Sequence, residues 1–158
     1  MQISRIPLDD TDRRLLDAVG RDGALTADRL GQALNLSASQ AGRRRQRLEA
    51  EGAIESYRAH LSPVALGLDV QAFVTVEMAT HDPETVKGFT RIVATRPEIV
   101  GAWTLTGEAD YLLRVYLPDL AALNALVHET LLPHPAVARV RSQIVMDHLK
   151  RDAPLPVF

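Results

Sequence analysis

The hydrophobic pattern of this chain changes its period at Val70. From there to Met78, alternate positions are apolar, and Gln71, Thr75 and Glu77 fall between them. Such alternation is typical of a β-strand with one buried face. The patterns that follow predict, in order, a helix at 82–96, strands at 99–106 and 111–117, a helix at 118–131 and a strand at 137–146.

This β-α-β-β-α-β order predicts a ferredoxin-like domain of the α+β class, with two helices on one face of an antiparallel sheet. The other face carries apolar residues, among them Phe73 and Val145, beside polar ones. An apolar face that no helix covers needs a partner. The pattern therefore predicts self-association through this face.

The residues before the sheet have helical spacing instead. Three helices are predicted, which begin at Asp9 or Thr11, at Thr26, and at Ser37 or Ser39, since all of these can cap a helix. The short turn before the third helix is typical of a helix-turn-helix, and the alternating residues 53–61 predict a β-wing. We expect a winged helix-turn-helix at 1–62, a linker at about 61–69 and the ferredoxin-like domain at 70–158.

The predicted third helix, residues 37–52, concentrates positive charge. It holds four arginines and no acid between Ser39 and Leu48. Arginine presents a planar fork of donors that suits phosphate oxygens and the guanine base edge. A solvated charged face, or a winged domain that binds only proteins, are the alternatives. The residues expected to contact double-stranded DNA are Ser37, Ser39, Gln40, Arg43, Arg44 and Arg47.

Arg45 does not fit this scheme. Its helical position, with Ala41 and Leu48, should face the core of the domain. Its methylene stem could lie along the core edge, with the guanidinium group in solvent. It could also pair with Glu49, or with an acid of the first helix such as Asp12 or Asp17. The sequence leaves these alternatives open.

The composition limits the classes of function. The 158 residues include no cysteine, which excludes disulfides, thiolate metal sites and cysteine nucleophiles. The net charge is −2, but residues 1–62 carry ten arginines against nine acids and are slightly basic. No apolar segment approaches the length of a membrane span, and the first residues lack a signal-peptide pattern, so a cytoplasmic protein is expected.

Nearly the whole chain resembles the Lrp/AsnC, or feast/famine, family of bacterial and archaeal regulators. The segment LDDTDRRLL lies at the start of the helix-turn-helix. The other matching segments are LSASQAGRRRQRLEAEGAIESY (36–57), LSPVALGLDV (61–70), LTGEADYLLRV (105–115) and RSQIVM (141–146). The resemblance implies a transcriptional regulator that forms dimers, often assembled into a ring of four dimers, and that responds to a small effector, usually an amino acid.

The resemblance also implies where the effector binds, namely where dimers meet, near the hairpin after the second strand. The family's Gly-Asp-x-Asp-Tyr pattern matches Gly107, Asp110 and Tyr111, whereas Glu108 is a conservative departure and Ala109 is smaller than the residue often found there. Further positions carried over from the family are Leu120, Ser142, Gln143 and Ile144. Arg45 stands where the family often has an apolar residue.

The chemistry of this hairpin suits an α-amino acid. Asp110 or Glu108 can accept hydrogen bonds from an ammonium group, while backbone amides near Gly107 and the Ser142 hydroxyl can donate to a carboxylate. An ordinary tight hairpin with acids facing solvent is the alternative.

Other functions have less support. The five histidines form no i,i+4 metal pair, and the chain has neither a phosphate loop nor a Gly-x-Ser-x-Gly motif. We therefore expect no enzyme, no metal and no cofactor other than the effector. An architectural protein that compacts DNA without sensing an effector is a further alternative.

Overall fold

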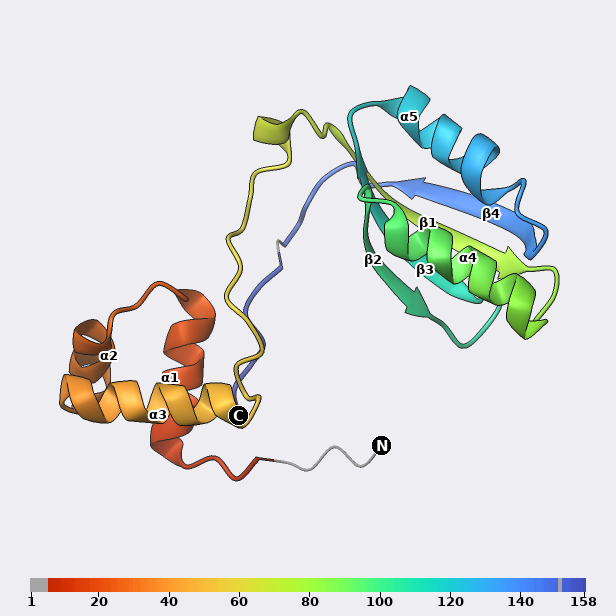
Figure 1. Cartoon of the computed structure of the whole chain (residues 1–158). Coiled ribbons are helices and arrows are strands. Elements are labelled where there is room, and N and C mark those ends of the chain that lie inside the picture. The colour runs from red at the N-terminus through yellow and green to blue at the C-terminus, as the bar shows by residue number, and fades with distance from the viewer. Residues whose placement is uncertain (1–5, 151) are drawn as a thin grey trace. The chain divides into compact units, whose positions relative to one another are not determined.

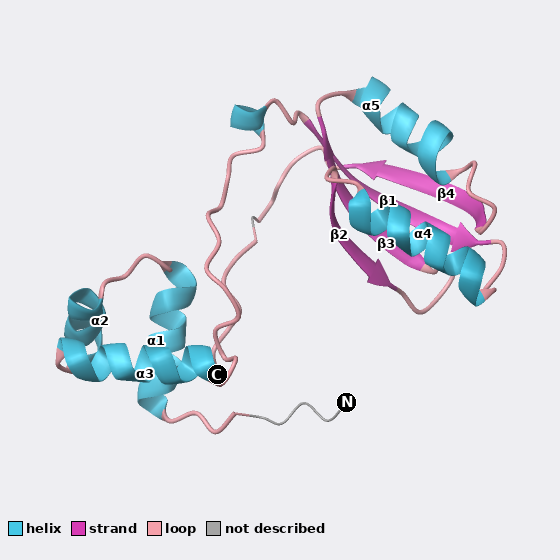
Figure 2. Cartoon of the chain, viewed as in Figure 1, coloured by secondary structure: helices cyan, strands magenta, loops and turns pink. Residues whose placement is uncertain are grey.

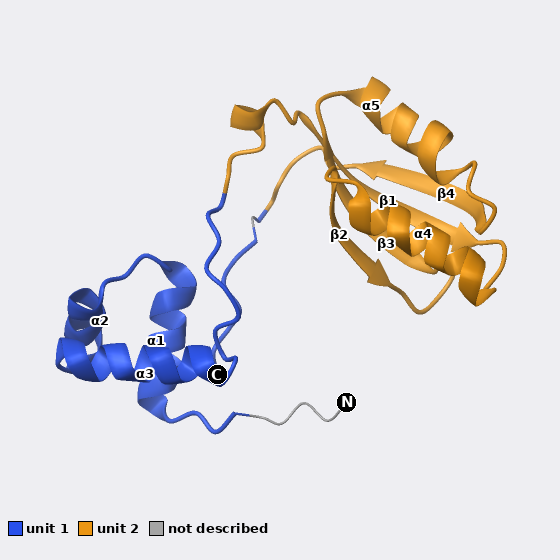
Figure 3. Cartoon of the chain, viewed as in Figure 1, with its two compact units in different colours: residues 1–60, 150–158 blue, residues 61–149 orange. Residues whose placement is uncertain are grey.

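The computed structural model of the protein describes residues 6–150 and 152–158. The chain divides into two compact units, residues 1–60 with 150–158 and residues 61–149 (Figure 3). We call the first unit the head and the second the sheet domain. The expected division placed the whole of 70–158 in the second domain, whereas residues 150–158 lie with the head.

The head is built from three helices, α1 (Asp10–Arg21), α2 (Ala27–Leu34) and α3 (Ala38–Ala50), as Figure 1 shows. Among the capping alternatives, the structure uses Asp9, Thr26 and Ser37, whose side chains accept hydrogen bonds from amides of the first turn. The three helices share one buried apolar cluster, formed by Leu15, Val19, Leu30, Leu34, Ala41 and Leu48.

The expected β-wing is wrong, because residues 53–61 form no β-strand (Figure 2). The N–H groups of Ala53 and Ile54 bond instead to the carbonyl oxygen of Leu48, at 2.9 and 3.2 Å, and both side chains pack against the core of the head. A strand needs a neighbouring strand to bond its backbone. Residues 53–61 have the alternating pattern of a strand, but among the described residues no neighbouring strand bonds their backbone.

The sheet domain has the predicted β-α-β-β-α-β order. Its elements are β1 (Val70–Met78), α4 (Pro83–Thr95), β2 (Ile99–Thr104), β3 (Tyr111–Leu117), α5 (Leu120–Ala125), which continues as a π-helical segment (Leu126–Leu131), and β4 (Val137–Ile144). A short 3-10 turn, Val64–Leu66, precedes β1. The strands are antiparallel in the order β2-β3-β1-β4.

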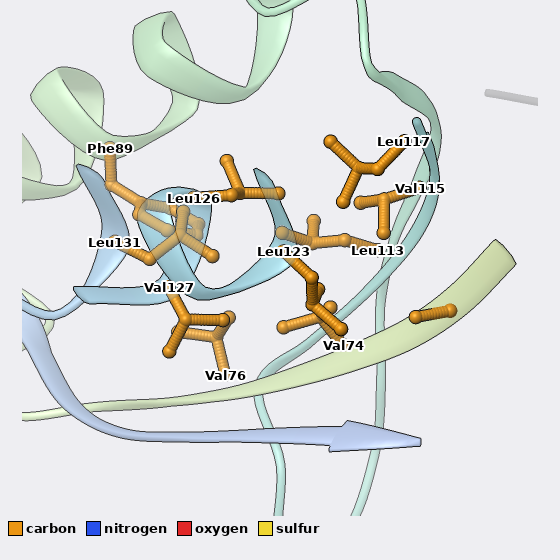
Figure 4. Packing of buried hydrophobic residues seen from close by; sticks show 11 residues of the cluster. Val74, Val76, Phe89, Leu113, Val115, Leu117, Leu123, Leu126, Val127 and Leu131 are labelled. Carbon is orange, nitrogen blue, oxygen red and sulfur yellow. The ribbon is translucent and has the colours of Figure 1, made fainter. Parts of the chain in front are cut away.

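The two helices cover one face of this sheet (Figure 1). Side chains from that face, such as Val74, Val76 and Leu113, pack against Phe89 of α4 and against residues of the segment after α5 (Figure 4). Residues that pair directly across neighbouring strands lie on the same face. The register therefore assigns Phe73, Trp103, Leu112 and Tyr116 to the opposite face, which we call the open face.

Candidate nucleic-acid interface and effector site

The start of α3 is held by two residues that were expected to contact DNA. The Ser37 hydroxyl accepts a hydrogen bond from the N–H of Gln40 at 3.3 Å, and the Gln40 side-chain oxygen accepts one from the N–H of Ser37 at 3.0 Å. This reciprocal capping box satisfies amides that have no partner within the helix. Both residues are exposed, but their oxygen atoms already serve to begin α3.

Two of the expected DNA-binding arginines are bound to acids at the start of α1. Arg44 donates to Asp9 and to Asp12, each at 2.7 Å, and Arg47 donates to the other oxygen of Asp12 at 2.5 Å. The Asp12 side chain is only 1% exposed. It therefore acts as a buried anion that fixes α3 against α1.

The charge of Asp12 is stabilised in this position. Burial by itself raises the pKa of Asp12, but hydrogen bonds from Arg47, from the Asp9 backbone N–H and from Arg44 outweigh it, so the pKa lies below its ordinary value. The pKa of Asp9 is also lowered, first by the backbone N–H of Asp12 and then by Arg44. Both carboxylates therefore remain ionised at neutral pH.

A stripe of exposed side chains lies on α3, in which the Ser39 hydroxyl shares a hydrogen bond of 3.2 Å with the Ser37 hydroxyl. Ser39, Arg43 and Gln46 are all exposed and follow helical spacing of four and three residues, so they lie on one side of the helix. Among the described residues, Arg43 forms no ion pair. Gln46 was not expected at this surface, although its spacing from Arg43 was the signal that could have identified it.

Arg45 binds at the edge of the head rather than in its core. Its Nε donates to Glu49 at 3.1 Å and to the Tyr57 hydroxyl at 2.8 Å, and its terminal nitrogens donate to the carbonyl oxygens of Leu25 and Gly23. The guanidinium carbon also lies 4.5 Å from the centre of the Tyr57 ring. Of the alternatives left open by the sequence, the structure therefore selects the pair with Glu49.

This cluster also fixes the chain that leaves the head. The Tyr57 hydroxyl donates to Glu49 at 2.7 Å, and this bond, more than that from Arg45, lowers the pKa of Glu49. The pKa of Tyr57 is raised by burial and by its bond to Glu49. Residue 57 is thus held to α3 by contacts of its side chain, not by strand pairing.

In the sheet domain, the hairpin that joins β2 to β3 is fastened to the end of β1 by Asp110. The carboxylate of Asp110 accepts a hydrogen bond from the N–H of Met78 at 2.7 Å, and its own N–H donates to Val76 at 3.0 Å. The second carboxylate oxygen lies 3.9 Å from Nε2 of the exposed His81. Gly107 has φ +122°, a left-handed value that suits glycine.

Charged residues lie around this hairpin. Glu108 is 89% exposed, and its carboxylate lies 3.7 Å from Arg141 of β4, which also pairs with Glu77 of β1 at 3.3 Å. The register assigns Glu77, Arg139 and Arg141 to the open face. Arg141 was not expected at the effector site. It supplies a positive charge next to the acids of the hairpin.

Four further residues carried over from the family lie outside the hairpin itself, on β4 and at the start of α5. Ser142 and Ile144 pair with Val74 and Ala72 on the helix-covered face, whereas Gln143 pairs with Phe73 on the open face. Leu120 follows the far end of β3, and the seven residues of that strand span roughly 20 Å. A single chain therefore does not bring all the expected effector residues together.

The described residues contain no group of three or more His, Asp or Glu side chains arranged to hold a metal ion. No helix in this part of the chain is long and apolar enough to cross a membrane.

Comparisons with known proteins agree with this architecture. The model of the AsnC-type helix-turn-helix domain matches residues 8–49, and that of the Lrp/AsnC ligand binding domain matches residues 71–155. The Escherichia coli transcriptional activator DecR is 32% identical over 150 residues, which cover 95% of this chain and 99% of DecR. The leucine-responsive regulatory protein of Salmonella typhimurium is also 32% identical, over 95% of this chain and 92% of its own length.

Solved structures show the same similarity. The transcriptional regulator NMB0573 of Neisseria meningitidis, in complex with L-Met, matches with a TM-score of 0.91 and 35% identity over 95% of this chain and 97% of its own. An AsnC family regulator from Agrobacterium tumefaciens matches with a TM-score of 0.86 and 33% identity, over 94% and 97% of the two chains. With its AsnC-type head and its ligand-binding sheet domain, this chain belongs to the Lrp/AsnC family of transcriptional regulators.

Proposed function

We propose that this regulator binds specific DNA sites through the exposed stripe of α3 and that an amino acid controls this binding. The observation that supports the DNA-binding surface is the position of Ser39, Arg43 and Gln46 on a helix that buried Asp12 fixes against α1. A fixed helix loses little further freedom when it enters a major groove, so its contacts are not weakened by ordering it.

Each side chain of the stripe has a role that follows from its chemistry. Arg43 either anchors a phosphate or donates to a guanine edge, and Gln46 and Ser39 bond to base edges. Arg44 and Arg47 take a supporting role, because their guanidinium groups already neutralise Asp9 and Asp12. The nitrogens of Arg47 that remain free extend the positive surface toward the DNA backbone.

Two copies of the head are needed to read a symmetric operator. We propose that the open face pairs two sheet domains into a homodimer, because it carries Phe73, Leu112 and Tyr116 and a Trp103 that is 46% exposed. The two α3 helices of the dimer would then enter successive major grooves, roughly 34 Å apart.

An assembly of dimers also accounts for the scattered effector residues. Leu120 and Ile144 are exposed apolar residues away from the hairpin, at 59% and 49%. We propose that the effector binds where a hairpin of one dimer meets another dimer, up to an octamer. There Asp110 or Glu108 would bind the ammonium group and Arg141 the carboxylate, since charge-assisted bonds suit both ends of an amino acid.

The choice of an amino acid is supported by the relatives, one of which is named for its response to leucine and another of which was solved with L-Met. Binding changes DNA recognition only if the effector prefers one assembly over another.

The DNA-binding surface is tested by substitutions of Arg43 and Gln46. The change Arg43→Ala should reduce the salt dependence of operator binding by about one unit if this residue contacts a phosphate, or cost about 1–3 kcal/mol at one base pair if it reads a base. The change Gln46→Ala should cost about 1–3 kcal/mol and relax the preference at one base pair. Fluorescence anisotropy with upstream promoter DNA, at several salt concentrations, measures both quantities.

The matched control is Arg91→Ala, which removes the same charge from an exposed position of α4 in the sheet domain. Its operator affinity should equal that of the unchanged protein. If Arg43→Ala and Gln46→Ala also leave affinity, salt dependence and base preference unchanged, α3 does not read DNA. Equal binding to random DNA would identify an architectural protein instead.

A further inference from the structure

The chain passes between its two units twice. It leaves the head near residue 61 to enter the sheet domain, and after β4 it returns, so that residues 150–158 belong to the head again (Figure 3). Neither the DNA-binding stripe nor the hairpin accounts for this return. We call residues 152–158 the tail.

The tail lies along α1 in the opposite direction to that helix. Arg13, in the first turn of α1, donates from Nε to the carbonyl oxygen of Phe158 at 2.7 Å, and its terminal nitrogen donates to Leu8 at 2.5 Å. At the other end of the helix, the Cβ of Pro154 lies 3.5 Å from where a Cβ on Gly20 would be. The tail therefore contacts both the beginning and the end of α1.

Between these two contacts the tail meets a hollow of the head. Val157 lines an open cavity of about 420 Å³ together with Arg13, Arg14, Asp17, Ala18, Ala33 and Leu34. The side chain of Val157 is half-buried, whereas its neighbours Leu155 and Phe158 are 86% and 96% exposed. Val157 is thus the least exposed residue of the tail, and it lines the cavity together with residues of α1 and α2.

The composition of the tail favours such docking. Pro154 and Pro156 alternate with Leu155 and Val157, and each proline restricts its own backbone and that of the residue before it. A chain with fewer unbound conformations loses less entropy when it is held against a surface. The lower entropy cost therefore favours docking through the contacts of Pro154, Val157 and Phe158.

We propose that the tail is a strap that docks on the α1–α2 surface of the head of its own chain and so ties β4 to the DNA-binding head. The strap is a second connection beside the linker that follows residue 60. It restricts the orientations that the head can take. Its effect on DNA binding rests on the function proposed above, but the docking itself does not.

An engineered disulfide tests the docking. Because the chain has no native cysteine, only the introduced thiols can form a disulfide. The distance of 3.5 Å at Gly20 and Pro154 lies within the separation of about 3.5–4.5 Å that Cβ atoms have in a disulfide. In the double variant Gly20→Cys/Pro154→Cys, mild oxidation should produce an internal disulfide within one chain. Non-reducing electrophoresis and mass spectrometry of tryptic peptides identify the product.

The single variants Gly20→Cys and Pro154→Cys give the background of collisional cross-links between chains. The variant Gly20→Cys/Pro154→Cys/Arg13→Ala should form the internal disulfide several-fold more slowly, because the bond to Phe158 is lost. Arg29→Ala, an exposed arginine of α2, should leave the rate unchanged in the same background. A disulfide formed only between two chains would show that the tail docks on a second copy, and no disulfide above the background would show that it does not dock. Either result overturns the strap.

The consequence for DNA binding is tested with operators whose half-sites are moved apart by about half a helical turn, roughly 5 base pairs. The unchanged protein should bind such DNA at least tenfold more weakly than the matched operator. A chain that ends at Lys150, or the full chain with Val157→Glu, should lose most of this discrimination, because its heads are held by one connection only. Unchanged discrimination in both variants would overturn the coupling. Failure of the unchanged protein to bind its operator would instead refute the proposed function, while the disulfide result still decides the docking.

Discussion

Asp12 is the residue on which the geometry of the head depends most. Its side chain is buried, accepts the N–H of Asp9 at 3.2 Å within the capping box of α1, and binds both Arg44 and Arg47 of α3. One carboxylate therefore begins one helix and positions another. Arginines that the sequence assigns to DNA are for this reason partly structural.

Replacing Asp12 by Asn keeps its shape but removes the negative charge. Loss of one partner of a buried ion pair costs roughly 3–5 kcal/mol. Because Arg44 and Arg47 are 33% and 43% exposed, water offsets part of this loss. We expect the free energy of unfolding to fall by about 1–3 kcal/mol, as measured by urea unfolding with far-UV circular dichroism. Asp17→Asn, which breaks the exposed pair with Arg21 on the same helix, should have a much smaller effect.

The difference between Asp12→Asn and the unchanged protein should also depend on pH. The pKa of Asp12 is lower in the folded head than its ordinary value of 3.8, so its contribution to stability is complete above that value. It should be lost as the pH falls below about 4 and Asp12 becomes protonated in the folded state. If the difference in stability stays constant from neutral pH down into this acid range, Asp12 does not act through its charge.

Among the larger elements, the hairpin between β2 and β3 combines a structural and a proposed binding role. Asp110 uses one oxygen to fasten the hairpin to Met78 of β1, and its side chain remains 34% exposed. These two roles make different demands on the side chain. The bond to Met78 needs only an oxygen acceptor, whereas binding of an ammonium group needs the negative charge.

This difference allows the roles of Asp110 to be separated. Asp110→Asn keeps an oxygen for the N–H of Met78, so the unfolding midpoint should change little, while the affinity for the effector should fall at least about tenfold. In Asp110→Ala, both the unfolding midpoint and the affinity for the effector should fall. Isothermal titration with L-methionine and L-leucine, and then with the other common amino acids, measures the affinity. Equal affinity of Asp110→Asn and the unchanged protein would leave Asp110 with its structural role alone.

For the whole molecule, the open face of the sheet domain is the feature that points beyond one chain. In the part of the chain that the structure describes, helices cover only the opposite face, so Phe73, Leu112 and Trp103 have none of these helices against them. Phe73 and Leu112 are partly buried and Trp103 is 46% exposed, and apolar groups left partly in contact with water favour association with a second copy. The proposed homodimer would carry two heads and would therefore suit a two-fold symmetric operator.

A charge on the open face should therefore prevent dimerisation. Phe73→Glu combined with Trp103→Glu places two carboxylates on the surface that would be buried. We expect sedimentation velocity to show the mass of a single chain for this variant and that of a dimer or a larger assembly for the unchanged protein. Operator affinity should fall at least tenfold, because the two half-sites are no longer bound together. Val64→Glu, at a residue that is 74% exposed before β1, should leave the mass unchanged. An unchanged protein that is already monomeric at micromolar concentration would refute the pairing.

Periodicity and capping residues were sufficient to predict most of the elements. The alternation from Val70 to Met78 and the helical spacing before it are local patterns, and local backbone preferences decide them. The three helices of the head and the β-α-β-β-α-β order of the sheet domain are therefore confirmed, and Asp9 and Ser37, each one of two expected capping residues, begin helices. The left-handed conformations of Asn35 and Gly52 also follow from their residue types.

Contacts between residues distant in the chain could not be derived in this way. The pairing of Asp12 with Arg44 and Arg47, of Arg45 with Tyr57, and of Arg13 with Phe158 depends on which surfaces the fold brings together. The same holds for residues 53–61, which alternate as a strand would but have no neighbouring strand among residues 6–150 and 152–158. A pattern reports what a segment prefers, whereas a buried charge or a docked tail is stable only where another part of the chain supplies its partner.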